Sequence, residues 1–133
     1  HVLFSADGRV QETGSSNVML ISSDRVITPP ADGSILEGVT RESILILASD
    51  RGLRVEERPV TVDELVSWCE KGEVALSGTA AVLAPVGTLI VDGAEITVGD
   101  GAAGRHTLEL RQALIDTQVG RAEDVHGWTL PVG

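Results

Sequence analysis

The sequence is poor in the flat side chains from which several kinds of binding site are built. Its only aromatic residues are Phe4, Trp68 and Trp128, and it has no tyrosine. Few side chains are therefore available to stack on nucleic-acid bases or on sugar rings. The core must consist mainly of Val, Leu, Ile and Ala.

Residue types that hold metals or form disulfides are also scarce. Cys69 is the single cysteine, which excludes a disulfide framework and a thiolate metal site. The three histidines, His1, His106 and His126, lack metal-ligand spacing with the acidic residues or with Cys69, so no metal is expected. A lone thiol favours a reducing compartment, and we expect a soluble, cytoplasmic protein.

Positive charge is sparse. Ten Lys and Arg residues stand against twenty Asp and Glu residues, which gives a formal net charge of −10. Nucleic-acid binding needs a basic face, and this composition does not supply one. No apolar run approaches the length that spans a bilayer. We therefore expect neither a nucleic-acid partner nor a membrane partner.

The remaining pattern predicts one mixed α/β domain over residues 1–133. Short apolar runs alternate with turn signals such as Asp7-Gly8 and Asp92-Gly93-Ala94, so strands should predominate. About three helices are expected, over residues 41–50 with Thr40 as N-cap, from Thr61 to about Cys69, and over 107–119. The opening residues resemble a strand already under way and the last ones a finished terminus, so we expect a truncated chain that retains its own C-terminus.

Two segments are candidate anion sites. Gly38-Val39-Thr40 precedes a predicted helix, whose first amides have no partner in the helix and attract anions. Ser77-Gly78-Thr79-Ala80-Ala81 consists of small residues, so its amides can face a ligand. Each segment also has a simpler interpretation, because most caps only end helices and most small-residue turns only connect strands.

Glu12 is the third candidate. It lies between Gln11 and Thr13-Gly14, shortly before a strongly apolar strand that starts at Asn17. A carboxylate that points into an interior needs a cation or a hydrogen-bond donor. The simpler interpretation is a solvated glutamate at a hairpin end, because surface glutamates are common.

Taken together, the order and spacing of residue types resemble the signature of the class IV aminotransferases. The match departs from the signature at Met19, where the family usually has Phe or Tyr. The matching positions are Glu12, Gly14, Asn17, Val18, Val26, Thr28, Leu36, Gly38, Val39 and Arg41.

Within that family, two further segments resemble the branched-chain aminotransferases. One is the turn from Ser77 to Ala81 followed by Pro85-Val86, and the other is His126-Gly127-Trp128. D-amino-acid aminotransferases and aminodeoxychorismate lyases share the fold and remain alternatives, as does a non-catalytic folded fragment. The resemblance runs from about Val10 to Leu130.

The resemblance implies the C-terminal, cofactor-binding domain of the D-amino-acid-aminotransferase-like fold, with a mixed, partly barrel-like sheet and pyridoxal 5′-phosphate as cofactor. Glu12 would pair with the pyridine nitrogen. Val39 and Thr40 would bind the phosphate through amides and the Thr hydroxyl, while Leu36 and Gly38 would shape the loop beneath the ring.

It also implies a substrate site. Thr79 would reach the phosphate, and Gly78, Thr79 and Ala80 would hold the substrate carboxylate. The substrates would be branched-chain L-amino acids (Leu, Ile, Val) and 2-oxoglutarate. No catalytic residue is assigned in this chain, because the family's Schiff-base lysine lies upstream and Lys71, the only lysine, sits in an acidic turn. The isolated chain should be inactive, and the intact protein, with its missing N-terminal half, should be a homodimer.

Overall fold

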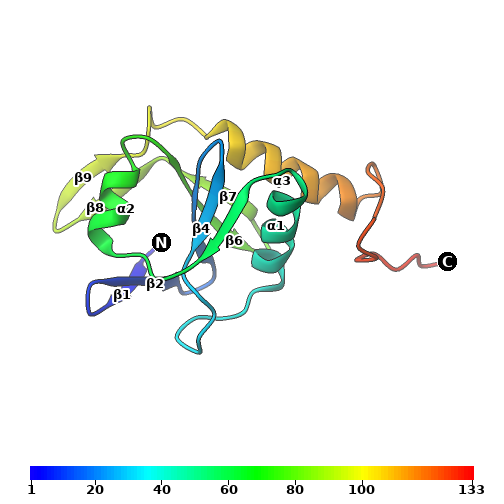
Figure 1. Ribbon diagram of the computed structural model, residues 1–133, viewed down its shortest axis with the longest axis horizontal. Coiled ribbons are helices and arrows are strands. Elements are labelled where there is room, and N and C mark those ends of the chain that lie inside the picture. The colour runs from blue at the N-terminus through cyan, green and yellow to red at the C-terminus, as the bar shows by residue number, and fades with distance from the viewer.

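A computed structural model describes all residues, 1–133, and contains nine strands and three helices (Figure 1). The strands are β1 (Leu3–Ala6), β2 (Arg9–Thr13), β3 (Asn17–Ile21), β4 (Arg25–Thr28), β5 (Arg54–Glu57), β6 (Glu73–Gly78), β7 (Val82–Val86), β8 (Thr88–Val91) and β9 (Ala94–Thr97). The helices are α1 (Val39–Asp50), α2 (Val62–Trp68) and α3 (Arg105–Gln118).

Strand β3 is the centre of a seven-stranded sheet. Its five residues are all buried. Along one edge β3 pairs antiparallel with β6 over its full length, and along the other it pairs with β2 at its start and with β4 at its end. Strands β4 and β5 are parallel, so the sheet is mixed. The prediction of a mixed α/β fold with three helices is confirmed.

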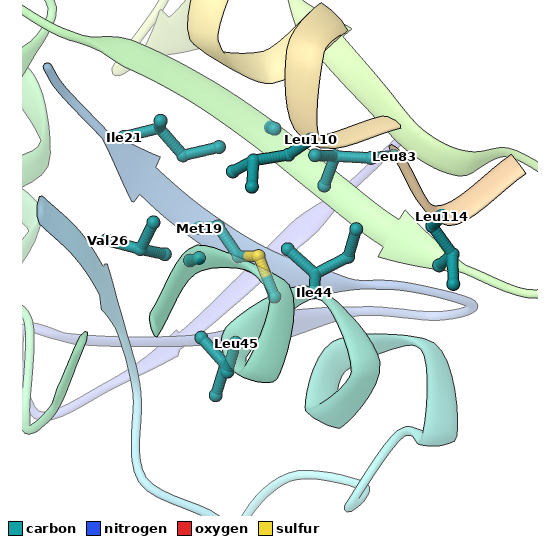
Figure 2. Close-up of a cluster of buried hydrophobic side chains, with 10 residues drawn as sticks. Met19, Ile21, Val26, Ile44, Leu45, Leu83, Leu110 and Leu114 are labelled. Carbon is teal, nitrogen blue, oxygen red and sulfur yellow. The ribbon is translucent and has the colours of Figure 1, made fainter. Parts of the chain in front are cut away.

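Two apolar clusters cover the two faces of this sheet. Residues of a strand alternate between its faces, so Met19 and Ile21 point one way while Val18 and Leu20 point the other. Helices α1 and α3 pack on the first face (Figure 2). Helix α2 packs on the second. The α1/α3 cluster contains Met19, Ile21, Val26, Ile44, Leu45, Ala48, Ala75, Leu83, Leu110 and Leu114.

The start of α1 differs from its prediction. The sequence pattern predicts Thr40 as the N-cap, but the helix begins at Val39 with Gly38 as N-cap, and the Glu42 amide donates to the Gly38 carbonyl at 3.0 Å. Gly38 packs against the buried side chain of Asn17, and a Cβ atom at this N-cap position would collide with Asn17 Oδ1. Thr40 is therefore the second residue of the helix, and its amide belongs to the open first turn.

Helix α2 begins as predicted, with half of its capping box. Thr61 Oγ1 accepts a hydrogen bond from the Glu64 amide at 3.1 Å. The Glu64 carboxylate does not return to Thr61. It accepts from both terminal nitrogens of Arg58, at 2.6 and 2.9 Å.

Helix α3 begins at Arg105, two residues before the predicted start. The Glu73 carboxylate, at the start of β6, accepts hydrogen bonds from the amides of His106 and Thr107 at 3.0 and 2.7 Å. A cap from a residue more than thirty positions away leaves no local pattern in the sequence. None of the three helices combines the length and the apolar character that a membrane crossing requires.

The predicted turn at residues 77–81 is shorter than expected. Strand β6 continues through Ser77 and Gly78, which pair with Leu83 and Val82 of β7, so the turn consists of residues 79–81. Ser77 and Gly78 are thereby held in the sheet rather than in a loop. After α3 the chain continues as a tail without helix or strand, drawn in orange to red (Figure 1), and His126 of this tail contacts Asp50 at the end of α1, with 2.7 Å between Nε2 and Oδ2.

Candidate functional site

A cavity of about 370 Å³ lies where β3 begins, at the N-terminus of α1. Three segments that are far apart in the sequence form its walls: the β2–β3 connection, the loop that enters α1, and the end of β6. The lining residues are Glu12, Thr13, Gly14, Ser15, Ser16, Asn17, Leu36, Glu37, Gly38, Val39, Thr40, Arg41, Ser77, Gly78 and Thr79.

The register of the sheet brings two of these segments together. Asn17 of β3 lies opposite Glu12 of β2 on one side and opposite Ser77 of β6 on the other. Side chains directly opposite one another in antiparallel strands lie about 5 Å apart at Cβ and share a face. The sheet therefore places a carboxylate, an amide and a hydroxyl in one row at the edge of the cavity.

Hydrogen bonds connect this row to the loop before α1. Asn17 Nδ2 donates to Glu12 Oε2 at 3.1 Å and to the Leu36 carbonyl at 3.0 Å. The Leu36 amide donates back to the Glu12 carboxylate at 3.1 and 3.2 Å. Glu12 is therefore not a solvated hairpin glutamate, because its carboxylate is bound from two segments of the chain.

At Gly38 and Gly78 the backbone of the cavity wall packs closely against neighbouring residues. A Cβ atom added at Gly38 would collide with Asn17 Oδ1, which leaves no room for a side chain. At Gly78 the nearest atoms would be the Ser15 carbonyl oxygen and Ser16 Oγ, both at 3.0 Å. Close packing thus excludes a Cβ atom at Gly38 unless Asn17 moves and leaves little space for one at Gly78, whereas backbone dihedral angles require neither glycine, since neither has a positive φ.

The cavity presents unpaired backbone donors at two places. The amides of Val39, Thr40 and Arg41 in the first turn of α1 donate to no backbone carbonyl. The same holds for the amides of Thr79, Ala80 and Ala81 after β6. Open amides at a helix start carry partial positive charge, which the helix dipole reinforces. The arrangement can hold anionic groups without a lysine or arginine.

The hydroxyl of Ser77 has no partner inside the protein. Ser77 is 2% exposed, and its Oγ is buried without a hydrogen bond. Buried hydroxyls are almost always hydrogen-bonded in native proteins, so an exception beside a cavity indicates a partner that enters the cavity.

Charged and reactive groups near the cavity are few. Arg41 lines it, but its Nη2 is occupied by the Pro29 carbonyl at 2.9 Å and by Glu57 at 2.7 Å. Cys69 is buried in the cluster on the α2 face, where burial raises the pKa of its thiol. The thiol is therefore uncharged at neutral pH, and nucleophilic chemistry by Cys69 is not expected.

Seven of the eight residues selected from the sequence line this one cavity: Glu12, Leu36, Gly38, Val39, Thr40, Gly78 and Thr79. Ala80 is exposed and lies just outside the lining, although its amide belongs to the same turn. Sequence reasoning missed the roles of Asn17 and of the Ser77 hydroxyl. Asn17 does occupy a signature position, which is the available signal, whereas the orphaned hydroxyl depends on tertiary packing alone.

Comparison with known proteins supports a specific family. The family model of Amino-transferase class IV matches residues 1–89. A probable branched-chain-amino-acid aminotransferase of Staphylococcus epidermidis is 43% identical over 126 residues, covering 92% of this chain and 35% of the relative. The branched-chain-amino-acid transaminase 1 of Bacillus subtilis is 36% identical, with the same coverage of 92% and 35%. The chain thus spans about a third of the length of these curated relatives.

Solved structures give the same result. The branched-chain amino acid aminotransferase of Escherichia coli superposes with a TM-score of 0.77 at 35% identity, over 92% of this chain and 39% of that one. The T.th. branched-chain amino acid aminotransferase complexed with N-(5′-phosphopyridoxyl)-L-glutamate superposes with a TM-score of 0.83 at 29% identity, over 98% of this chain and 42% of that one. With the family model matching about two thirds of its residues, this chain belongs to the class IV aminotransferase family.

Proposed function

We propose that this chain is the C-terminal, cofactor-binding domain of a pyridoxal-phosphate-dependent branched-chain aminotransferase. The intact enzyme would move the amino group of Leu, Ile or Val to 2-oxoglutarate, giving the branched 2-oxo acid and glutamate. The carrying observation is that Glu12, Thr40 and Thr79, from three separate segments, line one cavity. The identity to proteins named as branched-chain aminotransferases supports this choice within the family.

The donor set of the cavity fits pyridoxal phosphate. A volume of about 370 Å³ lies in the range of small-molecule sites. The coenzyme is a flat ring with a basic nitrogen and a phosphate. One wall offers a carboxylate, and two others offer open amides for an anion. The unpartnered Ser77 hydroxyl adds a polar contact that a ligand would satisfy.

Glu12 would hold the proton on the ring nitrogen. When bound, the coenzyme supplies an electron sink for cleavage of the substrate Cα–H bond, and a protonated nitrogen makes that sink effective. The carboxylate is suited to this role because Asn17 and Leu36 fix its position and Glu12 lines the cavity.

The two amide clusters would share the anionic groups. Val39 and Thr40 would bind the phosphate through their amides and the Thr40 hydroxyl, and Thr79 would reach the same phosphate. Gly78 permits close approach, and the amides of Thr79 and Ala80 would hold the substrate carboxylate. Leu36 and Gly38 would form the floor beneath the ring.

The catalytic lysine would come from residues of the protein outside this chain. Lys71 is exposed and precedes β6, at the opposite end of that strand from Ser77. We therefore propose that the isolated chain is inactive, and that the intact protein is a homodimer. Size-exclusion chromatography with light scattering tests the dimer.

The activity test uses the full-length protein with valine, leucine or isoleucine and 2-oxoglutarate. Glutamate formation is expected with all three, and Glu12→Gln should retain the coenzyme while turnover falls steeply. Glu70→Gln, on the exposed turn after α2, is the matched control and should be normal. Turnover of D-amino acids or aminodeoxychorismate instead of branched-chain L-amino acids would contradict the proposal, as would near-normal turnover by Glu12→Gln.

A further inference from the structure

We infer that Asn17 is a positioning residue that holds the Glu12 carboxylate in place. Asn17 is 4% exposed and stands at the first position of β3, between Glu12 and Ser77 in the sheet register. Its Nδ2 atom donates one hydrogen bond to Glu12 Oε2 and the other to the Leu36 carbonyl. Both amide protons are therefore used, and one of them is given to the carboxylate.

The surroundings allow only one orientation of the Asn17 amide. If Oδ1 and Nδ2 were exchanged, the amide oxygen would face two acceptors, Glu12 Oε2 and the Leu36 carbonyl, at about 3 Å. On the other side, Oδ1 packs against Gly38 so closely that a Cβ atom there would collide with it. Strand pairing and the helix entry thus clamp the amide with its donors toward Glu12.

The hydrogen-bond donors of the Glu12 carboxylate are the Asn17 side chain and the Leu36 amide. The other charged side chains that line the cavity are Glu37, from the same loop, and Arg41, from α1. Because Arg41 Nη2 is bound to Glu57 and to Pro29, neutral N–H donors are the direct partners of Glu12.

The inference rests on the proposed function, in which Glu12 must remain ionised beside the ring nitrogen. In the full-length holoenzyme, Asn17→Asp replaces a donor by a second carboxylate of equal size. Turnover should fall at least tenfold, as expected for loss of a hydrogen bond to a charged group, with little change in KM. The acidic limb of the kcat–pH profile should move to higher pH.

A second measurement, independent of turnover, is the pH at which the absorption band of the bound coenzyme changes. This pH should also shift in Asn17→Asp. Asn17→Ala, which removes the donor without adding charge, should show a smaller effect in the same direction and serves if Asn17→Asp does not fold. Thr28→Val is the matched control. It removes a buried hydrogen bond of 2.7 Å to the carbonyl of Val18, the residue next to Asn17, without touching Glu12, and it should leave both pH dependences unchanged.

A double-mutant cycle tests the positioning role of Asn17 separately from the proposed role of Glu12. If Asn17 acts through Glu12, Asn17→Asp should have at most a twofold effect when Glu12→Gln is already present. If Asn17→Asp lowered turnover equally with and without Glu12→Gln, the inference about Asn17 would be overturned while the proposed function would stand. A lower melting temperature with unchanged pH dependences would have the same consequence. Near-normal turnover by Glu12→Gln itself would remove the proposed role of Glu12 and the inference with it.

Discussion

Gly38→Ala tests the packing that joins the loop before α1 to the sheet. Gly38 has φ −66° and ψ 132°, which alanine adopts freely, so the cost is steric and not conformational. The added Cβ would collide with Asn17 Oδ1, and the buried amide must move. Moving it breaks the bond to the Leu36 carbonyl and the charge-assisted bond to Glu12, which together are worth about 3 kcal/mol. Lower entropy of the unfolded chain offsets about 1 kcal/mol, leaving a destabilisation of about 2 kcal/mol.

The assay is urea-induced unfolding of the full-length protein without coenzyme, followed by circular dichroism. Gly14→Ala is the matched control, because a Cβ there meets nothing within 4 Å and Gly14 has no positive φ. The same entropy term applies to Gly14, so this variant should be up to about 1 kcal/mol more stable than the unsubstituted protein. Hydrogen exchange at the Leu36 amide, which donates to Glu12, should accelerate in Gly38→Ala. A Gly38→Ala protein as stable as the control, with unchanged Leu36 exchange, refutes the steric argument.

Three further outcomes are expected. Glu73→Ala removes the acceptor for the first amides of α3 and should lower stability by about 2 kcal/mol in urea denaturation, whereas Glu70→Ala should not. Ser77→Ala removes a hydroxyl that has no hydrogen-bond partner in the protein, so stability without coenzyme should stay within about 0.5 kcal/mol of the unsubstituted protein. Coenzyme affinity, measured by fluorescence titration, should fall, and unchanged affinity would contradict a contact between Ser77 and the ligand. The hydrogen bond from Arg58 holds the pKa of Glu64 below its usual value. The pair therefore stabilises the fold fully at pH values above the ordinary glutamate pKa, and this stabilisation is lost as the pH falls through the lowered pKa of Glu64. In Glu64→Gln the free energy of unfolding should depend less on pH in this acidic range.

Local signals in the sequence predict most of the fold. The Asp7-Gly8 turn forms a hairpin with both residues at positive φ, and the Thr61 cap begins α2 as expected. These features depend on residues close in the sequence, whose preferences do not need the rest of the chain. The branching of the sheet at β3 and the start of α3 could not be predicted, because both depend on contacts between distant segments.

In the candidate site, too, some features follow from the sequence and others depend on contacts between distant segments. Glu12 could be selected because it occupies a position of the family signature. Thr40 and Thr79 could be selected because they lie in two segments that resemble the family, yet each of the three residues alone has a simpler interpretation. The error at Thr40 shows the limit of local patterns: the pattern assigns the Thr40 hydroxyl to the helix cap, whereas the helix has Gly38 as its N-cap, packed against Asn17. Hydrogen-bond partners of Asn17 and the lack of one for Ser77 arise only after the strands are paired.

Backbone geometry resolves the apparent conflict between a net charge of −10 and the proposed binding of a phosphate and a carboxylate. Surface charges act through water and salt over about 8–10 Å, whereas amides that line a cavity act at hydrogen-bond distance. Val39–Arg41 at the start of α1 and Thr79 after β6 provide such amides, and these residues line the same cavity as Glu12. If this account is correct, neutralising surface acids away from the cavity, such as Glu70 or Glu123, should change phosphate affinity far less than Gly38→Ala, which displaces the entry to α1.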